Sequence, residues 1–143
     1  MLNWFKDKFS RRPWMQMSFG ELIDKRAILR VKLNRLSNKT DLRMISKQIK
    51  FIDDGLRPYV CRHLTAELQE HLEDLMDTLE KNHYLQWDWE DAVLAASDVA
   101  EGVKAAKNSR LLNQVRAKIK REIDLMFNEK FLEIKDYAKP KDL

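Results

Sequence analysis

The sequence is poor in the residues that interrupt helices and in the residue that crosslinks chains. Its 143 residues include three glycines, three prolines and one cysteine, Cys61. So few turn-forming residues argue against a fold of many short strands and favour helices. A single cysteine excludes an internal disulfide and a cysteine-rich metal site, as is typical of a reducing compartment. We therefore expect a cytoplasmic, all-α protein in which Cys61 is a filler residue in a loop.

Membrane-spanning and catalytic signals are also missing. No apolar run approaches the roughly 20 residues that cross a bilayer, and we recognise no signal-peptide core at the N-terminus. The chain contains no glycine-rich phosphate loop, no nucleophile elbow and no zinc-ligand spacing. Glu80 and His83 make one Glu-x-x-His turn, but a helical two-metal site needs a second such turn. We therefore predict no metal, no cofactor and no catalytic residue.

The segment from Ser18 to Leu36 organises the expected fold. Ser18 and Glu21 have the spacing of a capping box, which predicts a helix start at Ser18. Apolar residues then form two stripes on a helical period, which are Leu22, Leu29, Leu33 and Leu36, and Ile23, Ala27 and Val31. A helix that is apolar on more than one side is expected in the middle of a bundle.

Three further helices are predicted. One begins at a Thr40 cap, carries an apolar seam and ends at residues 53–55, near Pro58. The next begins at Thr65 and runs to a break at Gly102. The last carries one apolar stripe, which is Leu112, Val115, Ile119, Ile123, Met126 and Phe127. We predict an antiparallel bundle of about four main helices (residues 18–137), preceded by a short N-terminal helix (residues 1–17) and followed by a loose tail (residues 138–143).

Charge is distributed unevenly along the chain. Residues 67–91 contain nine acidic residues and one lysine, while residues 104–121 contain seven basic residues and no acid. The simplest interpretation is that these runs are complementary faces of antiparallel neighbours. A second interpretation is that the basic helix binds nucleic acid, with Asn108, Asn113 and Gln114 available to it. Against that, several of its bases are expected to flank the apolar stripe.

Polar side chains beside the core seams predict a charged layer between three helices. Its candidate residues are Glu21, Lys25, Lys32, Arg35, Trp87, Glu90, Asp91, Asn113, Arg116, Lys120 and Asp124. Arginine and lysine in such a layer can clamp a phosphate or carboxylate. The alternative is a set of internal salt bridges that fixes helix register. For an anion site, Lys25, Lys32, Arg116 and Lys120 would contact the ligand, Glu21, Glu90 and Asp91 would orient them, and Asn113 would line the site.

The N-terminal segment is basic and amphipathic. Four large apolar residues lie among four bases before Pro13, and they are Leu2, Trp4, Phe5, Phe9, Lys6, Lys8, Arg11 and Arg12. Such a segment suits weak contact with an anionic membrane surface by residues 2–12, or a partner's groove. The simpler expectation is a short helix that folds its aromatic residues over the bundle.

Four ordered motifs carry a family resemblance. They are Glu21-Leu22-Ile23-Asp24-Lys25 with Ile28, Leu29, Lys32 and Arg35; Trp87-x-x-Glu90-Asp91; the run from Asn113 to Asp124; and Glu133-x-Lys135-x-Tyr137. This pattern resembles a family of short bacterial all-helical proteins of unknown function, often encoded near genes for lipopolysaccharide and O-antigen sugar assembly. The chain departs from the pattern at Gln114, Asp124 and Ile134, where that family usually has Asp, Asn and an acid. The resemblance implies homology and no particular activity.

The favoured hypothesis is a non-catalytic binding or adaptor protein that recognises a protein partner or a small anionic ligand through the charged layer. A homodimer would follow if one helix pair exposes an apolar seam. The first alternative is a small helical enzyme that acts on an anionic metabolite, by analogy with helical chorismate mutases. The second alternative, nucleic-acid binding by the basic last helix, is not favoured.

Overall fold

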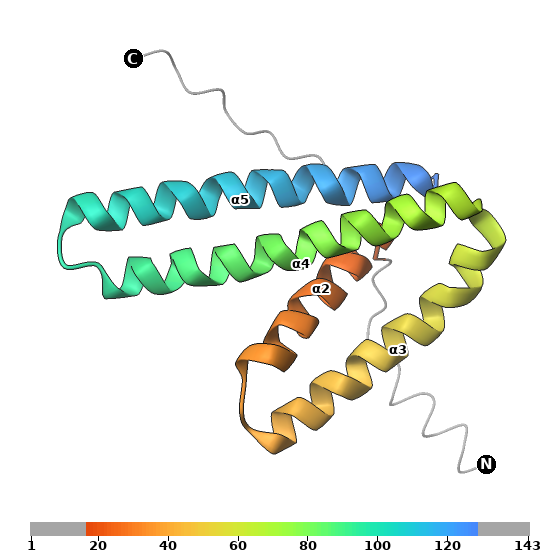
Figure 1. Ribbon diagram of the computed structural model, residues 1–143, viewed down its shortest axis with the longest axis horizontal. Helices are drawn as coiled ribbons and strands as arrows, with labels where there is room; N and C mark the ends of the chain where they lie inside the picture. Colours follow the sequence, from red (N-terminus) through yellow and green to blue (C-terminus); the bar gives the residue numbers. More distant parts are fainter. Residues whose placement is uncertain (1–16, 129–143) are drawn as a thin grey trace, which may run out of the picture.

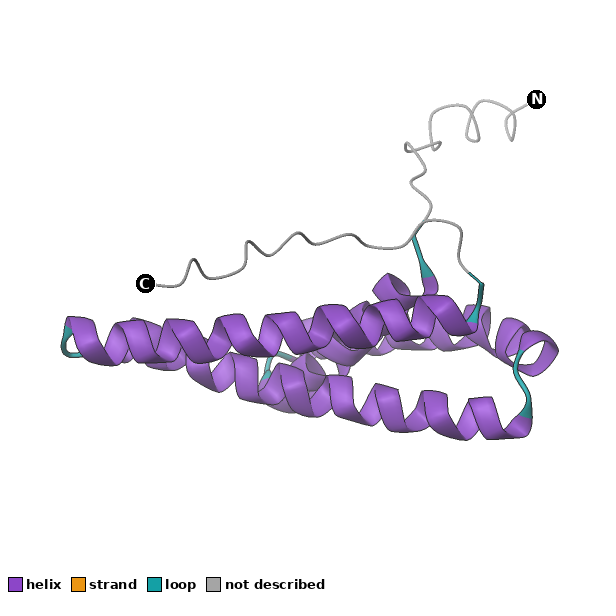
Figure 2. Cartoon of the chain, turned by 90° about the horizontal axis from the view of Figure 1, so that it is seen from above, coloured by secondary structure: helices purple, strands orange, loops and turns teal. Residues whose placement is uncertain are grey.

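The computed structural model describes residues 17–128, and every regular element in this range is a helix. The helices are α2 (Phe19–Arg35), α3 (Lys39–His63), α4 (Ala66–Ala95) and α5 (Val99–Met126). They form two hairpins with short loops, α2–α3 and α4–α5, and the first is inclined to the second (Figures 1 and 2). The predicted all-α fold of four packed helices is confirmed. The predicted N-terminal helix and the 138–143 tail lie outside the described residues.

Helix α2 is the centre of the assembly, as expected for a helix with two apolar stripes. It packs against α3, α4 and α5. Ile23, Ala27 and Val31, which form its second stripe, are fully buried. In its first stripe Leu29 is buried, whereas Leu36 is exposed because it follows the end of the helix. Stacking of Phe19 on Phe127, with ring centroids 4.1 Å apart, fastens the start of α2 beside the end of α5.

Capping residues explain most of the helix starts. Ser18 accepts the Glu21 amide proton and Thr65 accepts that of Leu68, which confirms both predicted starts. The second start was predicted at the wrong residue. Asn38, rather than Thr40, is the cap of α3, since its side chain accepts from the amides of Thr40 and Asp41.

The predicted end of α3 near residues 53–58 is wrong. The helix continues through Gly55 and Pro58 to His63. Leu56 is buried and Val60 is half-buried against the core, so burial on both sides of these residues outweighs their low helix propensity. Cys61 therefore lies on a helix and not in a loop, and its side chain is exposed.

The break predicted at Gly102 is also wrong. Helix α4 ends at Ala95 and α5 begins at Val99, so Gly102 lies inside α5. The Asp98 side chain caps α5 by accepting the Glu101 amide proton, and this local hydrogen bond moves the break towards the N-terminus. On the predicted last stripe, Ile119 and Ile123 are buried, but Val115 is exposed.

Candidate functional site

The charged layer forms around Asp24, a buried carboxylate on α2. Its Oδ1 lies 2.8 Å from Nε2 of His83 on α4 and 3.6 Å from Nε of Arg116 on α5. The three side chains are between 5% and 21% exposed. A buried carboxylate needs such partners because desolvation without compensation is costly. Asp24 therefore joins the three helices at one point.

Two further contacts extend the layer along α5. Lys120 Nζ donates to Oε1 of Glu21 over 2.6 Å, and the lysine side chain is 5% exposed. The backbone amide of Gly20 donates to Oδ1 of Asp124 over 2.6 Å. A Cβ at Gly20 would overlap the Lys120 carbonyl oxygen, so glycine permits this close approach of α2 and α5.

An amide continues the layer towards the surface. Arg116 donates to Oε1 of Gln86 over 3.1 Å, and Gln86 donates to Oε1 of Glu90 over 3.3 Å. Glu90 itself is exposed, so the chain of contacts runs from a buried carboxylate to solvent. Asn113 is half-buried nearby on α5, and its Oδ1 accepts no hydrogen bond from the described residues.

The structure brings together part of the predicted site. Glu21, Arg116 and Lys120 belong to the layer, and Glu90 lies at its outer edge. Three other candidates stand apart: Lys25 and Asp91 are exposed, Lys32 is half-buried, and none forms an ion pair within residues 17–128.

Sequence reasoning missed Asp24, His83 and Gln86 as members of the layer. A signal existed, because His83 and Gln86 follow Leu79 at spacings of four and seven and so continue its buried stripe. A polar residue at a core position indicates an internal partner.

In the structure the carboxylates of Glu21 and Asp24 already pair with Lys120 and Arg116, respectively. This arrangement suits fixing helix register better than clamping an added anion.

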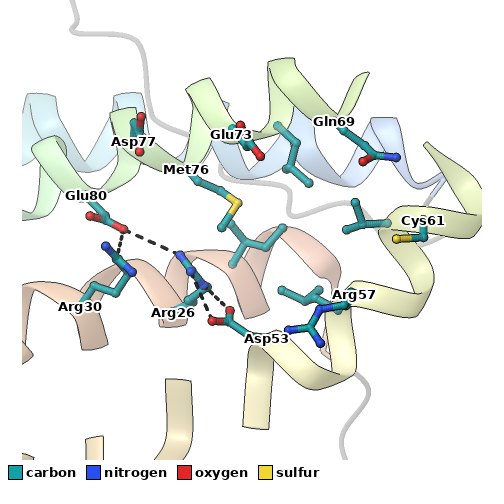
Figure 3. A pocket seen from close by; sticks show the side chains of 14 residues that line it. Arg26, Arg30, Asp53, Arg57, Cys61, Gln69, Glu73, Met76, Asp77 and Glu80 are labelled. Carbon is teal, nitrogen blue, oxygen red and sulfur yellow. Dashed lines mark hydrogen bonds and ion pairs between the residues drawn. The ribbon is translucent and has the colours of Figure 1, made fainter. Parts of the chain in front are cut away.

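A second candidate is an open cleft of about 510 Å³ between α2, α3 and α4 (Figure 3). Its floor is apolar, and ion pairs cross its α2 side. Arg26 Nε lies 2.5 Å from Oδ1 of Asp53, and Arg30 Nε lies 2.5 Å from Oε1 of Glu80. Those guanidinium groups are thus held by carboxylates on the neighbouring helices.

No group of three or more His, Cys, Asp or Glu side chains within residues 17–128 has the arrangement of a metal site.

The acidic and basic runs do not pair as expected. Helices α4 and α5 are neighbours, but the one ion pair between them in the described range joins His71 to Glu122 over 2.8 Å. Some acids of α4 pair with bases of α2 instead. Asp88 Oδ1, for example, lies 2.8 Å from a terminal guanidinium nitrogen of Arg35. Five of the seven bases in residues 104–121 are exposed, whereas Arg116 and Lys120 lie beside the buried stripe of α5. The five exposed bases are Lys104, Lys107, Arg110, Lys118 and Arg121.

The end of the α4–α5 hairpin, residues 87–101, projects beyond α2 and α3 (Figure 1). Between residues 87 and 118, Ala105 alone is buried. Leu94 is 87% exposed and Val99 is 82% exposed, and Val93 is exposed beside them. The segment contains five acids and no lysine or arginine. An acidic surface with uncovered aliphatic side chains at the end of two helices is typical of an interaction site.

No helix in residues 17–128 combines the length and the apolar character needed to cross a bilayer. Searches against family models, curated proteins and solved structures find no match to this chain.

Proposed function

We propose that this chain is a non-catalytic binding protein that holds a basic amphipathic helix of a protein partner on the end of its α4–α5 hairpin. The observation that supports this proposal is the exposure of Leu94 and Val99 on a segment where two helices bury almost nothing between them. Each large aliphatic side chain that a partner covers contributes about 1.5–3 kcal/mol of favourable transfer free energy.

The direction of the surface favours a helical partner. Glu80, which contacts α2, is followed on α4 by Trp87 and Leu94 at successive intervals of seven residues. Residues at this interval lie on one side of a helix. α2 ends at Arg35, which pairs with Asp88 on α4. The side of α4 that packs against α2 therefore extends beyond the end of α2. A partner helix bound on this part of α4 would lie in line with α2 and pack against α4 as α2 does.

The charge of the surface favours a basic partner. Glu90 and Asp91 are exposed between Trp87 and Leu94, and Asp98 and Glu101 follow in the loop and first turn of α5. Acidic margins around an apolar strip attract a helix whose apolar side is bordered by lysine or arginine, and they repel an acidic one.

A binding titration tests the proposal with a defined probe. The labelled peptide has the sequence of residues 1–13, which is basic and amphipathic, and a scrambled peptide has the same composition without the amphipathic order. Fluorescence anisotropy with the full chain should detect binding of the first peptide only. The double variant Leu94→Ser, Val99→Ser should weaken binding about tenfold or more, because each change removes an apolar contact of about 1.5–3 kcal/mol.

The matched control changes two exposed apolar residues on another helix. Met44→Ser with Phe51→Ser should change the Kd less than twofold, because α3 lies away from the end of the α4–α5 hairpin (Figure 1). Equal binding of the two peptides, equal losses in the two double variants, or no binding at all would each contradict the proposal.

A further inference from the structure

We infer that the outward face of α5 is a second docking surface, which rests on an anionic lipid bilayer. The face consists of a line of side chains along the helix and a shorter line beside it. The first line is Val103, Lys107, Arg110, Gln114, Lys118, Arg121 and Leu125, and the second is Lys104, Leu111 and Val115. This face begins at Val103, one helical turn beyond Val99, and the inference does not depend on the function proposed for the hairpin end.

Helical spacing places these residues on one side of α5. Successive members of the first line are three or four residues apart, which is the spacing of neighbours on a helix surface. The line runs from residue 103 to residue 125, which is about 33 Å along the helix axis at 1.5 Å per residue. The opposite side of α5, with Ala105, Ile119 and Ile123, is buried. The line therefore faces away from the rest of the fold.

The cations on this face are available to an outside partner. All five are exposed, and none forms an ion pair within residues 17–128. Glu122, the acid at the border of the face, lies 2.8 Å from His71. The unpaired acids of α4, such as Glu70, Asp74 and Asp77, are exposed on a different helix. The basic face can therefore approach an anionic surface along its full length.

Exposed aliphatic residues among the cations distinguish a bilayer from nucleic acid. Leu111, Val115 and Leu125 are each about half exposed, as is Val103. Leu111 and Val103 also line a shallow hollow with Lys104 and Lys107. A phosphate backbone offers no apolar contact to such side chains, whereas an interfacial layer accepts aliphatic groups beneath the headgroups that bind lysine and arginine.

Vesicle sedimentation with the full chain tests the inference. The vesicles contain phosphatidylcholine alone, or with about a third of phosphatidylglycerol. Binding should require the anionic lipid and should fall when the salt concentration is raised. Lys107→Gln with Arg110→Gln should lower the partition coefficient about tenfold or more, because each base contributes separately near a charged surface.

A matched variant controls for net charge. Arg43→Gln with Lys47→Gln on α3 makes the same charge change at two exposed positions and should lower partitioning less than twofold. Equal losses in the two double variants would overturn the inference in favour of general electrostatic attraction. No loss in the α5 variant would overturn it by placing the contact elsewhere in the chain.

One substitution at constant charge separates lipid from nucleic acid. Leu111→Ser should lower partitioning about threefold or more, because an apolar contact with the interface is lost. Leu111→Ser should leave far-UV circular dichroism unchanged, since residue 111 is exposed. If the chain ignores anionic vesicles but binds duplex DNA with an affinity that Leu111→Ser leaves unchanged, the face is a nucleic-acid site and the inference is wrong.

Discussion

Gly20 shows how a single residue sets the distance between two helices. Its amide donates to Asp124, and a Cβ in its place would overlap the carbonyl oxygen of Lys120 and lie 2.8 Å from Oδ1 of Asp124. The obstacle includes backbone, which cannot swing aside as a side chain can. The start of α2 therefore lies against α5 only because residue 20 has no side chain.

Gly20→Ala should destabilise the fold, while Gly55→Ala should stabilise it. At Gly20 the new methyl group forces α2 from α5, with a cost of about 1–3 kcal/mol, as for other overpacked sites. At Gly55, inside α3, nothing lies within 4 Å of the new Cβ, and the gain in helix propensity is about 0.5–1 kcal/mol. Urea denaturation measures both free energies of unfolding. Changes of the same sign would contradict this account.

Asp24→Ala should cost about 3 kcal/mol or more, because it leaves Arg116 and His83 in the core without their shared carboxylate. Asp91→Ala, an exposed control with no ion pair in the described range, should change the free energy of unfolding by less than about 0.5 kcal/mol. Thermal and urea unfolding of both variants provide the measurement. If Asp24→Ala changed the free energy of unfolding as little as Asp91→Ala does, the charged layer would not hold the three helices in register.

Part of this layer was accessible from sequence. Glu21, Arg116 and Lys120 border apolar stripes, and helical spacing predicted that they would meet. Asp24 was missed because only the tertiary fold brings His83, 59 positions away, to its carboxylate. Lys25 was included because it shares the helix with Glu21, although its side chain points to solvent. Periodicity places a residue on a side of its helix but does not identify the partner helix.

At the scale of elements, helix existence was predictable and helix ends were not. The predicted helices occur, and each buries part of its apolar stripe in the core. Gly55, Pro58 and Gly102 suggested ends that the structure does not have. Leu56 and Val60, packed in the core, continue α3 past Gly55 and Pro58, and the Asp98 cap starts α5 at Val99, three residues before Gly102. Tertiary packing and capping thus outweigh local propensity at these positions.

The loop between α4 and α5 should lose stability in acid. The Glu101 carboxylate accepts from the backbone amide and hydroxyl of Ser97 over 3.1 and 2.9 Å, and the amide hydrogen bond, followed by the hydroxyl one, holds the Glu101 pKa below its ordinary value. A lowered folded-state pKa stabilises the fold above the unfolded-state pKa, and this contribution is lost as the pH falls through the folded-state value.

Glu101→Gln tests this pH dependence. The wild-type chain should melt at a higher temperature than the variant at neutral pH, and the difference in Tm should shrink as the pH falls below the ordinary glutamate range. Circular dichroism melts between neutral and acid pH measure it. A difference in Tm that stays constant over this range would show that the carboxylate charge has no part in the loop.

At the scale of the whole molecule, the hydrophobic core is unevenly distributed over the two hairpins. The α2–α3 hairpin and the inner halves of α4 and α5 contain nearly all of the buried apolar residues. The outer end of α4–α5 has almost no core and holds most of its aliphatic side chains in solvent. Of the first feature, periodicity predicted the central, buried position of α2. The second depends on how far α2 reaches along α4, which the sequence does not specify.

Hydrogen exchange of the full chain tests the central claim, that the hairpin end binds a helix of a protein partner. In the free protein, amides of residues 89–104 should exchange much faster than those of residues 72–86, because few buried contacts oppose local opening. Saturating peptide of residues 1–13 should slow exchange at 89–104 and leave 72–86 unchanged. Equal, slow exchange in both segments of the free protein, with no effect of the peptide, would contradict the account.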